Sequence, residues 1–441
     1  MLIFIIFNKI NYFDHFMNPN HSQLLIDIQK KSNIIINNVG DIKFLKEAIE
    51  SKDNLKISFN TLRRLFGFLN QTKPTSITLN TLANYLEFTS YHNYLKNKSN
   101  FDEWYFQQRL LLLQQSNDLN EEAIQSITSG VFYNKNIVYA AYFIASLVHD
   151  NNLKILNIFF NKIELNKFHF SNLLQFATII THSFYRINEN KAIIIYNDLI
   201  KYESFRNTIP LLYIDYSNLN GIYLKVLRLV EKHSPVVSDL FFVSLMEFYR
   251  DFYSEGVCRN KEIKLPIGFS TFNPVLKGRF YAYKIMLSDA INSSLKKELF
   301  KQCSRNKVSY FLLEVIPVLL IKEEYNILTE LSDNFYEEIF ESEEWSDKTM
   351  SSIYLIGLAN ISWYNEETSS AKRNLELVIL EIVELSYHNF VSLFYYHTKI
   401  KISYSESDRD TNISSFLVLE KLIKKTGFTK FREVSKKYTL N

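Results

Sequence analysis

Apolar residues recur at helical spacing along most of this 441-residue chain. Beyond residue 100, stretches with an apolar side chain every three or four positions alternate with short polar segments rich in Asn, Asp and Lys. This pattern predicts helices at residues 121–129, 137–149, 152–163, 171–186, 191–202 and 238–253. Helices paired through short turns form α-solenoids, so we expect an all-α fold whose body is an α-solenoid of antiparallel helix pairs.

Two shorter periodic stretches between residues 58 and 94 predict two short helices joined by a turn. Ser58 is suited to cap the first helix, and Gly67 is suited to end it in a left-handed conformation. Pro74 keeps the connection extended, and either Ser76 or Thr78 is expected to cap the second helix. The apolar faces consist of Leu62, Leu65 and Phe66 in the first helix, and Leu79, Leu82, Ala83 and Leu86 in the second.

This segment resembles the helix-turn-helix of the lambda-repressor-like (XRE) family. In that family a recognition helix S-x-x-T-[LI]-x-R precedes a Pro-containing turn and a helix T-L-x-x-L-A-x-x-L. Here the matching sequences are SFNTLRR at 58–64 and TLNTLANYL at 78–86. The resemblance implies two preceding helices, at 22–33 and 41–51. The segment 52–57 is longer than the family's usual turn, and the family's Gln-Ala pair is absent.

The resemblance implies contact with double-stranded DNA. A recognition helix presents its N-terminal polar residues to base edges while lysines and arginines contact phosphates. The residues expected to contact DNA are Ser58, Asn60, Thr61, Arg63, Arg64 and Lys73. The first hundred residues contain twelve Lys or Arg and seven Asp or Glu, which is a modest basic excess. The alternative is that Arg63 and Arg64 form a solvated helix face and that the segment is a helical cap on the body.

The body also carries a weaker resemblance, to tetratricopeptide arrays, of which residues 358–375 are the nearest single unit. Residues 256–278 interrupt the helical pattern with three Gly and two Pro, and they predict a loop or a boundary between two helical halves. The predicted organisation is a dispensable segment at 1–16, with translation beginning at Met17, a helix-turn-helix-like domain at 17–98, and helical-repeat regions at 101–255 and 279–441.

Composition agrees with helices, because 9 Gly and 7 Pro are few for this length. Two cysteines are too few for a disulfide framework and favour a reducing cytoplasm. The apolar run at residues 2–7 is too short to span a membrane, and a secretory leader is not expected. An acidic segment at 323–347 and a basic one at 421–437 are either solvated helix faces or surfaces for separate partners, including a second subunit.

The sequence lacks the phosphate-binding, dinucleotide-binding, nucleophile-elbow and H-E-x-x-H motifs, so we expect no enzyme, cofactor or metal site. One permissive pattern, Asp251 followed by Glu262 and Lys264, imitates metal-dependent nucleases and requires a strand pair. The leading hypothesis is a DNA-binding transcriptional regulator whose helical body senses a peptide or protein. This layout is similar to quorum-sensing regulators, which join a helix-turn-helix domain to tetratricopeptide repeats, and a homodimer of such a protein would bind palindromic operators. The alternative is a protein-interaction scaffold without nucleic-acid binding.

Overall fold

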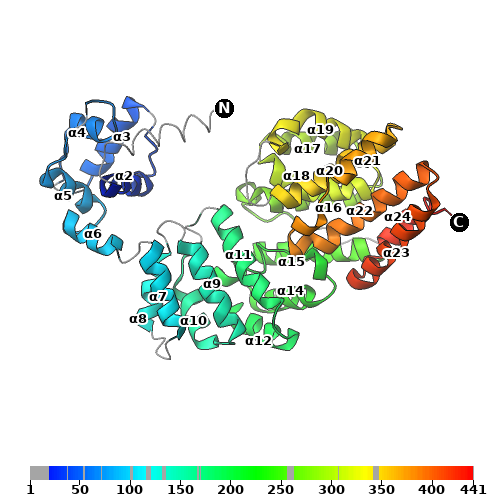
Figure 1. The fold of residues 1–441 in the computed structure, drawn as a ribbon, viewed down its shortest axis with the longest axis horizontal. Coiled ribbons are helices and arrows are strands. Elements are labelled where there is room, and N and C mark those ends of the chain that lie inside the picture. The colour runs from blue at the N-terminus through cyan, green and yellow to red at the C-terminus, as the bar shows by residue number, and fades with distance from the viewer. Residues whose placement is uncertain are drawn as a thin grey trace. The chain divides into compact units, whose positions relative to one another are not determined.

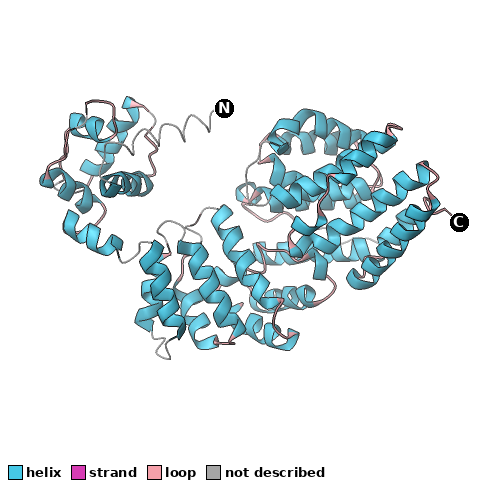
Figure 2. Cartoon of the chain, viewed as in Figure 1, coloured by secondary structure: helices cyan, strands magenta, loops and turns pink. Residues whose placement is uncertain are grey.

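The computed structural model describes residues 19–36, 38–52, 55–70, 72–99, 103–115, 121–131, 136–165, 168, 170–255, 263–305, 307–340 and 347–440. Within these residues the regular structure is entirely helical, as Figure 2 shows, which confirms the predicted all-α class. Every described helix is too short or too polar to span a lipid bilayer. The predicted dispensable segment at 1–16 lies outside the described residues.

The chain divides into two compact units. Residues 1–115 together with 130–136 form the first, and residues 116–129 together with 137–441 form the second. The helices of the first unit are α2 (Pro19–Ser32), α3 (Val39–Glu50), α4 (Phe59–Leu65), α5 (Ser76–Tyr85), α6 (Tyr91–Ser99) and α7 (Glu103–Gln115) (Figure 1). The helices predicted at 22–33 and 41–51 are α2 and α3.

Helices α2 to α6 enclose one apolar core. Helix α3 packs against both α2 and α4, while α5 packs against α2 and α6. The side chains at the centre of this core are completely shielded from solvent: Ile28, Ile42, Leu45, Ile49, Leu62, Leu82 and Ala83. Burying each Leu or Ile contributes about 1.5–3 kcal/mol, so the apolar faces read from the sequence hold α4 and α5 in place.

The helices that follow extend from residue 121 to residue 436. They are α8 (Glu121–Gly130), α9 (Asn136–His149), α10 (Leu153–Lys162), α11 (Phe170–Phe184), α12 (Glu189–Leu199), α13 (Glu203–Thr208), α14 (Ile222–His233), α15 (Val237–Glu255), α16 (Pro274–Leu287), α17 (Ser293–Cys303), α18 (Val308–Ile321), α19 (Tyr325–Phe340), α20 (Asp347–Tyr364), α21 (Thr368–Glu376), α22 (Leu385–Ser405), α23 (Arg409–Thr426) and α24 (Lys430–Lys436). Three short 3₁₀ helices, η2 (Tyr216–Asn218), η3 (Phe269–Thr271) and η4 (Leu380–Ile382), lie between them.

Most helices of the second unit pack against near neighbours in the sequence. Helix α12 packs against α10 and α14, and the row continues from α14 to α15, α16, α18, α20 and α22. Figure 1 shows α18, α20 and α22 side by side. Near-neighbour packing is what stacked helix pairs produce. The unit also contains longer-range contacts, of α22 with η2 and of α24 with α15.

The predicted break at 256–278 is shorter than expected at its C-terminal side. Helix α16 begins at Pro274, with the side chain of Asn273 accepting a hydrogen bond from the amide of Leu276 at 2.8 Å. Proline is favoured in the first helical turn because its missing N–H has no partner there in any case. The helix therefore begins five residues before the predicted start of the second helical-repeat region at residue 279, because Pro274 is compatible with the first turn of a helix.

Candidate functional site

Helix α4 begins at the residue that the sequence predicted. The amide of Thr61 donates to Oγ of Ser58 at 3.0 Å, and the hydroxyls of the two residues lie 2.8 Å apart. These contacts satisfy amide groups that the first turn of a helix leaves unpaired. Ser58 and Thr61 therefore have a structural role in forming α4, in addition to the DNA contact predicted for them.

The C-terminus of α4 also follows the prediction. Gly67 has a φ of 75°, its amide donates to the carbonyl of Arg64 at 3.2 Å, and the amide of Phe68 donates to the carbonyl of Arg63 at 2.8 Å. A residue with a side chain is strained in this left-handed conformation, whereas glycine is not. The two capped ends limit α4 to seven residues.

The outward side chains of α4 are polar or cationic. Asn60 and Arg64 are exposed, whereas Arg63 is half-buried. The guanidinium carbon of Arg63 lies 5.7 Å from the ring centre of Phe59, and Nη1 donates to Oδ1 of Asn60 at 3.4 Å. Nε of Arg63 is buried without a hydrogen-bond partner. Arg63 thus lies along its own helix, and Arg64 is the more accessible cation.

The predicted cap of α5, either Ser76 or Thr78, was wrong, because the cap is Thr75. The side chain of Thr75 accepts a hydrogen bond from the amide of Thr78 at 3.2 Å, and the backbone of Thr75 is extended, as at a helix N-cap. Ser76 is already the first helical residue. Thr75, Ser76 and Thr78 are all suitable capping types, so the sequence alone did not distinguish between them.

Lys73 is close enough to α2 to act electrostatically on it. It is exposed in the segment that precedes α5. The pKa of His21, in α2, is lowered chiefly by burial and further by the positive charge of Lys73. Five of the six predicted DNA contacts are therefore brought together at α4, and the sixth acts electrostatically on the start of α2.

Part of the basic excess is neutralised within the first unit, which the sequence did not reveal. Lys31 and Lys52 both bind Oε1 of Glu87 at 2.8 Å, and these contacts lower the pKa of Glu87 to about 2. The ring of Tyr85 lies 5.8 Å from each ammonium nitrogen. The cations in the described part of this unit that form no ion pair are Lys30, Lys43, Lys56, Arg63, Arg64, Lys73 and Arg109.

Among the described residues, Asp251 and Lys264 are not arranged on the strand pair that the nuclease-like pattern requires. Asp251 binds its neighbour Arg250 at 2.5 Å. Lys264 is exposed in a segment without regular structure, and Glu262 lies outside the described residues. Across the described residues no group of three His, Cys, Asp or Glu is placed to hold a metal ion.

The acidic and basic segments of the body are joined by a contact between Glu323 and Lys437. Nζ of Lys437 lies 2.6 Å from Oε2 of Glu323, and the hydroxyl of Tyr438 donates to Oε1 of the same carboxylate at 2.9 Å. Arg432 forms a two-fold contact with Glu420, each hydrogen bond being 2.7 Å long. These charges stabilise the C-terminal helices, and they are not free for a separate partner.

A cavity in the second unit was not anticipated from the sequence. It has a volume of about 160 Å³ and is lined by residues of α11, α16, α18, α20 and α22 and of the segment 211–214. The Lys, Arg, Asp and Glu side chains among its lining residues are Arg279, Lys348 and Glu384. These three residues are far apart in the sequence and lie in no recognisable motif, so no local signal could have associated them.

Comparisons of the chain with protein-family models, with curated proteins and with solved structures gave no match. The resemblance to a helix-turn-helix therefore depends on the residues quoted above. The structure adds the position and the capping of α4.

Proposed function

We propose that the chain is a DNA-binding transcriptional regulator in which α4 enters the major groove and the helical body binds a peptide or protein effector. The observation that carries the proposal is the placement of α4. Leu62 and Leu65 are buried in the core, while Asn60 and Arg64 are exposed on the opposite side. Asparagine reads adenine through two hydrogen bonds, and arginine binds guanine or phosphate.

The size of α4 fits this role. An α-helix with its side chains is about 10–12 Å in diameter, which matches the width of about 12 Å of the major groove of B-DNA, and the seven residues of α4 extend over roughly 10 Å along it. The contact of α3 with α4 supplies the paired helices that a helix-turn-helix requires. The near-neighbour packing of the second unit supports a solenoid-like body.

Salt-dependent binding of the full chain to duplex DNA tests the proposal. A protein that contacts phosphates loses affinity steeply as salt rises, with a slope of about −0.9 per contact on logarithmic axes. The double variant Arg63→Ala/Arg64→Ala is expected to reduce the affinity and to flatten this slope by up to about two contacts. Arg228→Ala/Lys232→Ala removes the same charge from two exposed positions of α14 and serves as the control.

No binding at low salt, or equal losses in the two double variants, would refute the proposal. The second candidate function, a protein-interaction scaffold, would then remain. One observation favours it: α7 exposes Tyr105, Leu111 and Leu112 to 56%, 54% and 67%, respectively. Exposed apolar side chains that are close together on one helix are typical of surfaces that bind another protein.

A further inference from the structure

The cavity in the second unit has the size of one large apolar side chain. Its volume is about 160 Å³, and an engineered cavity of about 150 Å³ lined by aliphatic residues holds a benzene molecule. Seven aliphatic residues contribute to its walls: Leu174, Leu211, Leu212, Ile214, Val275, Leu313 and Ile382. A branched or aromatic side chain therefore fits among them.

Glu384, at the N-cap of α22, places a carboxylate in the wall of this cavity. Its Oε1 is fully used, by the hydroxyl of Tyr213 at 2.6 Å, by Nε2 of His182 at 2.6 Å and by the amide of Leu385 at 3.1 Å. Burial alone would raise the pKa of Glu384, but the hydrogen bonds from His182 and Tyr213 outweigh it and the pKa lies below its usual value. The carboxylate is ionised at neutral pH, and Oε2 accepts no hydrogen bond from the described residues.

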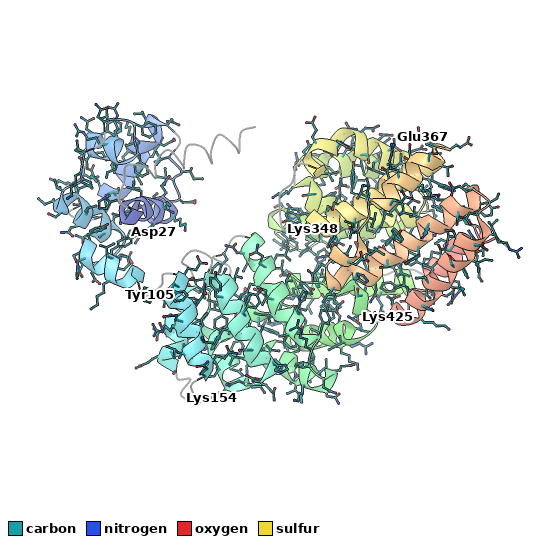
Figure 3. The ribbon with its side chains drawn as sticks, in the orientation of Figure 1. Asp27, Tyr105, Lys154, Lys348, Glu367 and Lys425 are labelled. Carbon is teal, nitrogen blue, oxygen red and sulfur yellow. The ribbon has the colours of Figure 1, made fainter. Side chains whose placement is uncertain are left out.

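Two cations share the same cavity. Arg279 is only 3% exposed; its Nη2 binds Glu314 at 2.8 Å and its Nε lies 3.3 Å from the hydroxyl of Tyr216. The guanidinium of Arg279 also forms a hydrogen bond with the side chain of Tyr387, so it contributes positive charge to the cavity wall while being held by three side chains. Lys348, in the first turn of α20 (labelled in Figure 3), is exposed and forms no ion pair within the described part of the chain.

We propose that this cavity binds a free amino acid with an apolar side chain. The ammonium group donates to Oε2 of Glu384, the carboxylate is held by Lys348 beside the positive charge of Arg279, and the side chain fills the aliphatic part. A ligand with only one charge leaves the opposite group of the cavity uncompensated, and such a group is costly to desolvate. The termini of a peptide are on different residues, so a peptide end presents only one of the two charges at this site.

The beginnings of two helices support the same arrangement. Asn273 and Val275 at the start of α16, and Thr349 at the start of α20, belong to the cavity wall. Helix N-termini carry partial positive charge, which favours a carboxylate nearby. The inference goes beyond the proposed function and does not depend on DNA binding, so the failure of one leaves the other standing.

Calorimetric titration of the full chain tests the ligand class. L-phenylalanine and L-leucine are the probes. The analogues 2-phenylethylamine, which lacks the carboxylate, 3-phenylpropanoate, which lacks the ammonium group, and phenylalaninamide, which mimics a peptide N-terminus, are each expected to bind at least tenfold more weakly than phenylalanine. No binding of either amino acid at millimolar concentration, or equal binding of phenylalanine and a one-charge analogue, would overturn the proposal.

Two variants assign the charges within the site. Glu384→Gln is expected to weaken the binding of phenylalanine at least tenfold and to leave the affinity for 3-phenylpropanoate unchanged or higher. Lys348→Gln is expected to weaken the binding of phenylalanine and of 3-phenylpropanoate but not the binding of 2-phenylethylamine. Lys154→Gln, at an exposed position of α10 (also labelled in Figure 3), is the matched control.

Lys348 is exposed, so its variant tests the proposal even if Glu384→Gln does not fold. Equal affinities of Lys348→Gln and Lys154→Gln for phenylalanine would contradict the assignment of the carboxylate. A variant Glu384→Gln that folds and binds phenylalanine as tightly as the unaltered chain would contradict the assignment of the ammonium group.

Discussion

The contact of α16 with α18 depends on a glycine, and replacing it gives the sharpest test of the packing. A Cβ atom added at Gly278 would overlap the carbonyl oxygen of Phe311 and lie 3.2 Å from both the Cα and the carbonyl carbon of that residue. The obstacle is backbone, which cannot rotate away as a side chain can. Gly278→Ala must therefore push α16 and α18 apart.

Gly357 in α20 offers a matched comparison. A Cβ atom there would meet Cγ2 of Ile316 at 3.5 Å and the methyl groups of Leu328 at 3.9 Å, which are ordinary contacts. Replacing a helical glycine by alanine gains up to about 1 kcal/mol of stability, whereas overpacking costs about 1–3 kcal/mol and occasionally more. We expect Gly357→Ala to be neutral or stabilising by up to about 1 kcal/mol and Gly278→Ala to be destabilising by about 2 kcal/mol or more.

Urea unfolding measures both changes, as shifts in the midpoint with an unchanged dependence on urea. Since the chain has two compact units, hydrogen exchange of the amides in α16 and α18 is followed in parallel to assign the loss to the second unit. A Gly278→Ala variant as stable as the unaltered chain, or a Gly357→Ala variant that loses as much, would show that the inferred close approach of α16 and α18 is wrong.

Four further changes test individual features of the two units. Burial raises the pKa of Asp215 to about 6, so the protonated side chain stabilises the fold below about pH 4, and this contribution is lost as the pH rises through 6. Urea unfolding should therefore show the free energy of unfolding fall by roughly 3 kcal/mol at most between pH 4 and pH 7, and Asp215→Asn should lack this fall. Burial lowers the pKa of Lys401 to about 7, so stability is expected to fall as the pH decreases from about 10 to 7, and thermal unfolding of Lys401→Met at pH 9 and pH 7 should show a smaller fall. Glu87→Gln releases its two lysine partners, so DNA binding should become tighter and more salt-dependent; unchanged binding would mean that these lysines lie away from the DNA. Thr75→Ala should cost about 1 kcal/mol in urea unfolding through loss of the α5 cap, whereas Ser76→Ala should cost much less, and the reverse order would contradict the observed cap.

The sequence by itself determined the helical class, the positions of the helices for which it gave ranges, from α2 to α5, from α8 to α12 and α15, and both ends of α4. These features depend on residues within about one helical turn of each other, such as Ser58 with Thr61 and Gly67 with Arg64. Capping, propensity and periodicity act over that range and can be recognised without knowing the fold. The cap of α5 was missed because three neighbouring side chains were equally suitable.

Only the tertiary structure decided which charges are neutralised and where an internal site lies. Glu87 is 56 residues from Lys31 and 35 from Lys52, yet it binds both. Arg279 lies within α16, Lys348 lies in the first turn of α20, and Glu384 directly precedes α22. All three nevertheless line one cavity. Contacts of this kind depend on how helices pack, and packing is set by the shapes of many side chains acting together, which no short stretch of sequence specifies.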